Sequence, residues 1–345
     1  MVWGNSTARV RSITGTPVNF SGNQASDSGG AIVNAPNNLT GSLSIDNTVF
    51  YGNLVPPNTV LAGYGGAVAA QGVSTTMTNV TFQQNQGRFG GAVFIGNGQG
   101  AVTASIGHAV FDHNSSGSWG GGLYANTATT VVSVTDTAFT NNQAVAAGGG
   151  LARFAARLTV TDSSLTNNTA GQAGGGVYND PGPTAADGGY TEIHDTTIAA
   201  NTASSGGGIY NNAEANLQNV TLLNNTGGLY QARSATITRA ADTVWQNPDS
   251  PNCAGVTTVS SAGGNFATDT TCGLTVMSTD RQGTGLNAQL GPLTNDGPNT
   301  TWYALPQSGS PLINTAVPKC ATTDQRHAAR PDACDIGAVE FGGIR

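Results

Sequence analysis

The residues with the most evident chemical potential are acids that recur at one position of a repeated phrase. Asp136 and Asp162 occupy it in consecutive copies. If each copy forms one layer of a stack with the interstrand spacing of roughly 4.8 Å, their carboxyl groups lie about 5 Å apart, as in a retaining glycosidase. The nearest bases, Arg153 and Arg157, belong to a different segment, and Thr or Ser follows each Asp as in a turn. We therefore expect turn residues here and no catalytic residue.

A denser group of acids lies in an insertion rich in Pro and Gly. It contains Asp180, Asp187, Glu192 and His194, followed by Asp195. A solvated loop is the simpler interpretation, but long loops are also where a repetitive scaffold carries binding sites. We therefore treat the first four residues as a candidate loop site. Ca²⁺ could bind there, but no recognised ligand spacing supports it, so we predict no cofactor and no metal site.

A third set of residues is aromatic and follows a run of Gly and one apolar residue in each copy. If that apolar residue points inward, period-2 alternation directs the next side chain outward. Such a row could stack on sugar rings or on another protein, or it could simply stabilise a sheet. Ala152 interrupts the row, which consists of Phe94, Tyr124, Tyr178, Tyr210 and Tyr230.

The elements that must position these residues follow from the repeat itself. A large apolar residue marks each copy and recurs in steps of 24 (Ile198 to Leu222) to 33 residues (Leu165 to Ile198). Such steps indicate a solenoid with one coil per copy. The copies are rich in Gly, Thr, Asn and Val, which disfavour helix interiors, and they lack the Leu grid of leucine-rich repeats. Short alternating segments such as Leu158–Val160 fit strands.

We therefore predict an all-β fold, a right-handed single-stranded parallel β-helix of about eight coils over residues 1–245, with a disulfide-containing C-terminal cap over residues 246–345. Equivalent residues then form columns along the axis. One column contains only Asn, three residues after the apolar residue, and is expected to be a structural amide ladder; it comprises Asn53, Asn85, Asn114, Asn142, Asn168, Asn201 and Asn225. The acid or amide column comprises Asn47, Asn79, His108, Asp136, Asp162, Asp195, Asn219 and Asp242.

The composition is that of a weakly charged protein and agrees with a rigid extracellular one. Charged residues make up 9% of the chain and the formal net charge is -7, so nucleic acid and anionic membranes are poor partners. No apolar run of 18 residues predicts a membrane span. The four cysteines fall in the last hundred residues. Proximity favours Cys253 with Cys272 and Cys320 with Cys334 among three connectivities, and four free thiols remain the alternative.

The C-terminal motifs are distinct from the repeat. They include Asp324-Gln-Arg326, Arg330-Pro331 and Cys334-Asp-Ile-Gly-Ala-Val-Glu340. With the repeats, these motifs resemble the bacterial parallel β-helix proteins that end in a choice-of-anchor Q domain. The resemblance implies a secreted or surface-attached bacterial protein of pectate-lyase-like shape. This chain has His327 where that family usually has Gly. From their mixed signs, we expect the acids and arginines here to form an internal ion-pair network that fastens the cap over the last coil.

Together these features predict a secreted or cell-surface, noncatalytic scaffold or adhesin-like rod. Because a β-helix exposes unpaired strand edges at its ends, copies could assemble head to tail into fibres. The alternative is a carbohydrate-active enzyme or a polysaccharide-binding protein. The expected partners are therefore other copies of the chain or surface glycans.

Overall fold

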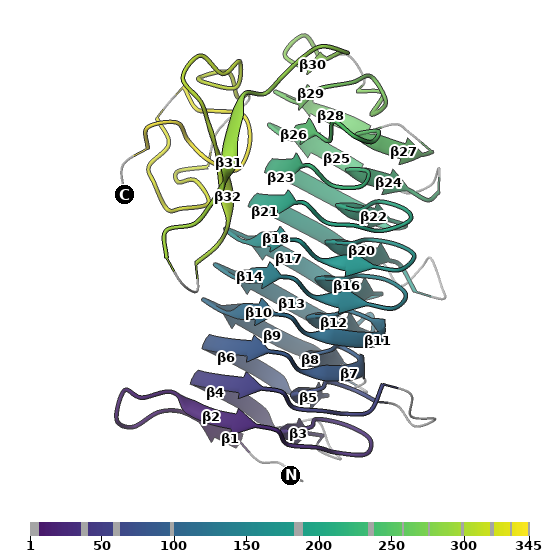
Figure 1. Cartoon of the computed structure of the whole chain (residues 1–345), viewed down its shortest axis with the longest axis vertical. Coiled ribbons are helices and arrows are strands. Elements are labelled where there is room, and N and C mark those ends of the chain that lie inside the picture. The colour runs from purple at the N-terminus through teal and green to yellow at the C-terminus, as the bar shows by residue number, and fades with distance from the viewer. Residues whose placement is uncertain are drawn as a thin grey trace.

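The computed structural model describes residues 7–35, 41–57, 63–96, 100–182, 189–233, 238–256, 259–274, 277–297, 300–317, 321–331 and 333–343. Within these ranges every helix or strand element is a strand, and the strands stack into a tall parallel β-helix (Figure 1). The predicted fold class is confirmed. None of the described residues forms a helix long and apolar enough to cross a membrane.

The largest sheet wraps around one corner of the β-helix. In several coils one long strand covers both sides of the corner, and in others two short strands do so. Its described strands are β1 (Thr7–Val10), β2 (Val18–Ser21), β4 (Ser42–Tyr51), β6 (Ser74–Gln83), β9 (Val102–Gly107), β10 (Val110–Asp112), β13 (Thr130–Thr135), β14 (Ala138–Thr140), β17 (Arg157–Thr161), β18 (Ser164–Thr166), β21 (Tyr190–Ala199), β23 (Glu214–Leu223), β25 (Thr238–Ala241), β26 (Val244–Gln246), β28 (Val259–Gly263), β29 (Phe266–Ala267) and β30 (Arg281–Gln282).

Two further parallel sheets close the coils. The longer one contains β3 (Ile32–Asn34), β5 (Val68–Gln71), β8 (Val93–Gly96), β12 (Leu123–Asn126), β16 (Leu151–Phe154), β20 (Val177–Asp180), β22 (Ile209–Asn211), β24 (Leu229–Gln231) and β27 (Cys253–Gly255). The shorter one contains β7 (Gln86–Phe89), β11 (Ser115–Trp119), β15 (Gln143–Ala144) and β19 (Thr169–Ala170). Parallel pairing continues beyond residue 245, where we predicted the solenoid to end, because β24 pairs with β27 and β26 with β29.

The marker residue of each coil forms the spine of the core. Phe82 and Phe139 lie in register with Phe111, and all three are fully buried. The rings stack with centroids 4.7 and 4.6 Å apart. The column then continues through Leu165, Ile198, Leu222 and Trp245. Large apolar residues therefore recur because each ring packs on its equivalents above and below.

The Asn column forms a continuous amide ladder inside the wall. The Nδ2 of Asn114 donates to the Oδ1 of Asn142 at 2.9 Å and to the Phe82 carbonyl at 2.9 Å, while its backbone N–H donates to the same Oδ1 at 3.0 Å. The pattern repeats from Asn53 to Asn225, and every member is buried. Each side chain thus satisfies backbone groups that the turn would otherwise leave buried and unpaired. The ladder is internal, so these amides face one another and no ligand.

The Gly runs mark a second corner where neighbouring coils come very close. Gly148 has φ 68°, which glycine adopts without steric cost. A Cβ on Gly149 would lie 2.5 Å from the Gly175 carbonyl oxygen of the next coil. Only glycine fits both requirements, which explains the regular spacing of these runs.

The C-terminal flank, defined by the described residues from 288 to 343, turns back and runs along the side of the solenoid (Figure 1). Its antiparallel strands are β31 (Leu290–Thr294) and β32 (Tyr303–Pro306). The backbone N–H of Trp302 donates to Ser164 Oγ at 2.9 Å, and that of Ala338 donates to Thr221 Oγ1 at 3.1 Å. We expected this region to be fastened over the last coil. The flank does pack on the late coils, where Ile336 lies against Val244 and Phe266, but it also extends along the side to the middle coils.

Cys253 and Cys272 form the predicted disulfide. They join β27 to the segment that follows β29, near the C-terminal end of the solenoid. Cys334 is also disulfide-bonded, and its predicted partner Cys320 lies outside the described residues.

Candidate functional site

The acid or amide column lies at the corner of the largest sheet. Its eight members all have positive φ, from 42° at Asp195 to 55° at Asn79. Asn, Asp and His tolerate this left-handed conformation better than other side chains, so their identity follows from the backbone of the corner. The side chains of Asn79 and His108 are exposed, whereas those of Asp195 and Asp242, further along the solenoid, are buried. The column therefore passes from solvent to a position beneath the C-terminal flank.

Arg330 fastens the flank to this column. Its Nη2 lies 3.2 Å from Asp195 Oδ1 and its Nη1 lies 3.2 Å from Glu340 Oε2, with all three side chains buried. It also donates to the carbonyls of Gly337 at 2.8 Å and Asp335 at 3.1 Å. Burial raises the pKa of Asp195, and the Arg330 guanidinium opposes that shift. Arg330 therefore joins two segments that are distant in the sequence. We call its ion pairs with Asp195 and Glu340 the Arg330 lock.

A second ion pair completes the network within the flank. Arg326 Nη2 lies 2.7 Å from Asp324 Oδ2, and the same carboxylate oxygen accepts the backbone N–H of Glu340 at 2.9 Å. Asp335 Oδ1 accepts the backbone N–H of Asn314 at 2.8 Å. The acids and arginines of the C-terminal motifs are therefore engaged in folding the flank, with little capacity left for catalysis.

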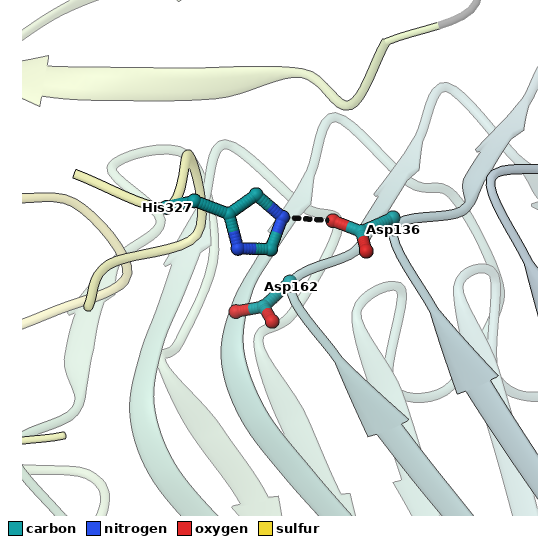
Figure 2. Close-up of side chains that lie close together, drawn as sticks. All are labelled: Asp136, Asp162 and His327. Carbon is teal, nitrogen blue, oxygen red and sulfur yellow. Dashed lines mark hydrogen bonds and ion pairs between the residues drawn. The ribbon is translucent and has the colours of Figure 1, made fainter. Parts of the chain in front are cut away.

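One side chain of the flank reaches the column at a different point. His327 Nε2 lies 2.5 Å from Asp136 Oδ1, and Figure 2 shows the imidazole beside both Asp136 and Asp162. One ligating atom from each of the three residues lies within 4.8 Å of the others. His108, in the preceding coil, places its Nδ1 3.7 Å from Asp136 Oδ2. From the sequence we expected only turn residues at Asp136 and Asp162, whereas the structure brings both beside His327.

The two carboxyl groups of this cluster differ in their surroundings. Asp136 has the imidazoles of His327 and His108 beside it. No hydrogen bond or ion pair within 4 Å engages the side chain of Asp162 among the described residues, although it is half-buried. Burial raises the pKa of Asp162 to about 7, and the nearby Asp195 carboxylate adds to the shift. At neutral pH the site therefore holds a carboxyl group that a proton or a cation would stabilise.

Beside the cluster, the flank and the coils enclose a groove. We define the groove as three adjoining hollows, two lined by both the flank and the coils and the third by the coils alone. Each pair of hollows has one lining residue in common, which is Thr300, His108 or Thr81. Their volumes are about 310, 190 and 280 Å³. The lining combines Trp302 with hydroxyl, amide, imidazole and carboxyl groups, including Asp112, His113, Thr140, Asn141, Asp136, Asp296 and His327. Such a mixture can hydrogen-bond a polar, extended ligand and stack against its ring faces.

The candidate loop site is not assembled among the described residues. Asp180 ends β20 and accepts hydrogen bonds from Tyr178 Oη at 3.0 Å and Asn212 Nδ2 at 2.9 Å. Glu192 and His194 lie two residues apart in β21, a strand of a different sheet. Asp187 lies outside the described residues. A ligand-binding role for this group stays a prediction without geometric support.

The aromatic column is only partly exposed. Phe94 and Tyr124 are buried, because Tyr64 packs against Phe94 while Phe89 and Trp119 pack against Tyr124. The predicted outward exposure is wrong for these two residues. Tyr178, Tyr210 and Tyr230 are half-buried and stack on one another, with centroids 5.2 and 5.3 Å apart and interplanar angles of 17° and 5°. Neighbouring rings cover the ring faces that a sugar would need, which favours a structural role.

Comparison with known proteins adds one finding. Residues 17–35 match a model of the Chlamydia polymorphic membrane protein repeat. No curated protein and no solved structure matches the chain. The chain is thus a parallel β-helix with a short segment similar to a repeat of a membrane-protein family. The match lies outside the C-terminal motifs, so the resemblance to choice-of-anchor Q proteins stays a prediction.

Proposed function

We propose that this protein is an extracytoplasmic β-helical rod that binds a polysaccharide chain in the groove between its coils and its C-terminal flank. The observation that carries the proposal is the groove itself, three adjoining hollows of which one is lined by Trp302 and all are lined by polar groups. A polysaccharide offers repeated hydroxyl groups and ring faces along an extended chain, which suits such a lining.

Two features of the chain, a disulfide and a short family match, support an extracytoplasmic location. The Cys253–Cys272 disulfide is typical of proteins that fold in an oxidising compartment. The similarity of residues 17–35 to a repeat from a membrane-protein family fits the same location. The proposal keeps the scaffold or adhesin-like role expected from the sequence and assigns it a ligand class. Head-to-tail assembly stays a prediction.

Charge indicates which glycans should bind. The groove is lined by Asp112, Asp136 and Asp296, and the protein has a formal net charge of -7. A polyuronate would place further carboxylates against these acids, and like charges in a partly desolvated groove repel. We therefore expect neutral or aminated glycans to bind and polyuronates not to bind.

A glycan array followed by calorimetry on the best binder tests the proposal. Trp302→Ala should abolish or strongly weaken binding, while the backbone bond from residue 302 to Ser164 Oγ is retained. Tyr210→Ala, in the aromatic column on another sheet, is the matched control and should bind like the wild type. Circular dichroism establishes that both variants are folded. Absence of binding to every glycan, or equal binding by the Trp302 variant, would contradict the proposal.

Product analysis of the same glycans separates binding from turnover. The Asp136 and Asp162 pair gives the hydrolase alternative geometric support, since glycosidases use two carboxyl groups. Release of reducing ends that is lost in Asp162→Asn would replace a binding role with a catalytic one.

A further inference from the structure

We propose that Asp136, Asp162 and His327 form a binding site for a transition-metal dication, with Zn²⁺ as the expected ion. The three ligating atoms, one per residue, lie within 4.8 Å of one another (Figure 2). A Zn²⁺ ion takes carboxylate oxygen and imidazole nitrogen at about 2.0 to 2.2 Å. Small side-chain rotations of the three residues would bring them to those distances.

The charges of the cluster favour a cation. Asp136 and Asp162 are corner residues of consecutive coils, and the parallel stacking of β14 on β18 and of β13 on β17 holds their backbones together. Two carboxylates at this separation repel unless a positive charge lies between them. One imidazole carries at most one positive charge and cannot cancel both negative charges. A dication can, and it also gives the Asp162 carboxylate the partner it lacks among the described residues.

The kind of cation follows from the ligand atoms. Ca²⁺ and Mg²⁺ prefer oxygen ligands alone, and Ca²⁺ takes six to eight of them. An imidazole nitrogen with two carboxylates suits Zn²⁺ or another first-row transition ion. Three protein ligands also leave a fourth tetrahedral position. Asp136 and His327 line one hollow of the groove, and water or a ligand in that hollow could supply the fourth ligand.

The site joins two parts of the chain that are far apart in sequence. His327 belongs to the flank and lies 191 residues from Asp136 in the sequence. A bound ion would therefore cross-link the flank to the coils, in addition to the Arg330 lock. The inference goes beyond the proposed glycan binding and does not depend on it, because the ion is tested with no glycan present.

Calorimetry with ZnCl₂ on tag-free, chelator-treated full-length protein tests the site. We expect one saturable ion per chain and a rise in melting temperature on Zn²⁺ addition, because a ligand that binds only the folded state stabilises it. The informative variant is His327→Gly, since residue 327 has φ 63° and Gly adopts that conformation without strain. Asp162→Asn provides a second, isosteric variant. Each should weaken Zn²⁺ binding by at least about tenfold.

The matched control is His194→Ala, which removes an imidazole on the outside of β21. It should bind Zn²⁺ like the wild type. Co²⁺ gives a spectroscopic readout, since a tetrahedral nitrogen and oxygen site absorbs visible light and the His327 variant should lose that band. Equal Zn²⁺ binding by His327→Gly and the wild type would overturn the proposal. So would tighter binding of Ca²⁺ than of Zn²⁺.

Discussion

The coils and the C-terminal flank use polar residues in opposite ways. In the coils a buried polar side chain bonds to its own equivalent one turn away, as Asn114 does with Asn142. In the flank a buried polar side chain bonds to unlike partners, as Arg330 does with Asp195 and Glu340. Repetition therefore identifies structural residues in this protein. Contacts between unlike residues identify places where the chain does something that a bare solenoid does not require.

The corner column is where the two regions meet. Away from the flank its members are Asn47 and Asn79, which are sufficient for a left-handed corner. Under the flank they include Asp195, which pairs with Arg330, and Asp242, whose Oδ1 accepts the Val317 N–H at 2.6 Å. The backbone requirement is the same in every coil, so the contacts of Asp195 and Asp242 with the flank are additional to it.

The largest expected effect comes from breaking the lock. Arg330→Met keeps a long side chain but leaves Asp195 and Glu340 buried without their counter-charge. Removing one partner of a buried ion pair costs about 3 to 5 kcal/mol. We expect the free energy of unfolding, measured in denaturant by circular dichroism, to fall by that amount. Limited proteolysis should then cleave the flank before the coils.

Arg239→Met is the control for this variant, because Arg239 is exposed on β25. Its free energy of unfolding should stay within about 0.5 kcal/mol of the wild type. If Arg330→Met were as stable and as protease-resistant as the wild type, the flank would be held by its apolar contacts and the lock would be incidental.

A somewhat smaller loss is expected from interrupting the amide ladder. Asn142→Ala removes the acceptor of the Asn114 N–H and Nδ2, at 3.0 and 2.9 Å, and the donor to the Phe111 carbonyl. Each buried polar group left unpaired costs about 1 to 3 kcal/mol, and local relaxation offsets part of the sum. We expect a loss of roughly 3 kcal/mol in denaturant unfolding.

Ser133→Ala serves as the control for the ladder variant, because Ser133 is exposed on the same coil. This variant should show no measurable loss in the free energy of unfolding. A ladder variant as stable as this control would mean that water replaces the amide, and the contrast between coils and flank would lose its basis.

Asp242, a coil residue bonded to the flank, should make the stability of the protein depend on pH. Burial raises the pKa of Asp242 to about 6, and its Oδ2 has no hydrogen-bond partner among the described residues. The folded state therefore binds this proton more tightly than the unfolded state. The stabilisation is fully present below about pH 4 and is lost as the pH rises through about 6.

Asp242→Asn keeps the Oδ1 acceptor for the Val317 N–H and carries no charge. We expect it to be more stable than the wild type at pH 8, by at most about 3 kcal/mol, and equally stable near pH 4. Asp249→Asn, an exposed control, should show no such trend. Thermal unfolding of both proteins between pH 4 and pH 8 measures this difference in stability. A difference that does not change with pH would show that the titration of Asp242 is not its cause.

Much of the fold could be predicted from the sequence, because each coil contacts mainly its neighbours and repeats the same requirements. Phe139, Asn142 and Gly149 each occupy a column whose role follows from one coil stacked on another. The path of the flank could not be predicted. It depends on single contacts, such as that of Trp302 with Ser164. Such contacts do not recur from coil to coil, so the repeat pattern cannot predict them.

The candidate site was missed for the same reason. Asp136 and Asp162 could be placed on consecutive coils, but His327 reaches them from 191 residues away. One signal was available in the sequence. The corner column changes from Asn47 and Asn79 to Asp136 and Asp162, although the backbone conformation stays the same. This change of side chain without a change of backbone falls where the flank reaches the coils, although Asn219 keeps an amide on a coil that the flank also contacts through Thr221.

The smallest expected effect separates the two aromatic sets. Tyr210→Leu removes a ring stacked between Tyr178 and Tyr230, which costs about 0.5 to 1.5 kcal/mol beyond the loss of buried area. Because neighbouring rings cover its faces, we expect unchanged glycan binding. Trp302→Ala should do the reverse, weakening binding with little effect on the coils. If Tyr210→Leu instead reduced glycan binding with no loss of stability, the ligand would lie on the repetitive face, and repetition would no longer identify structural residues.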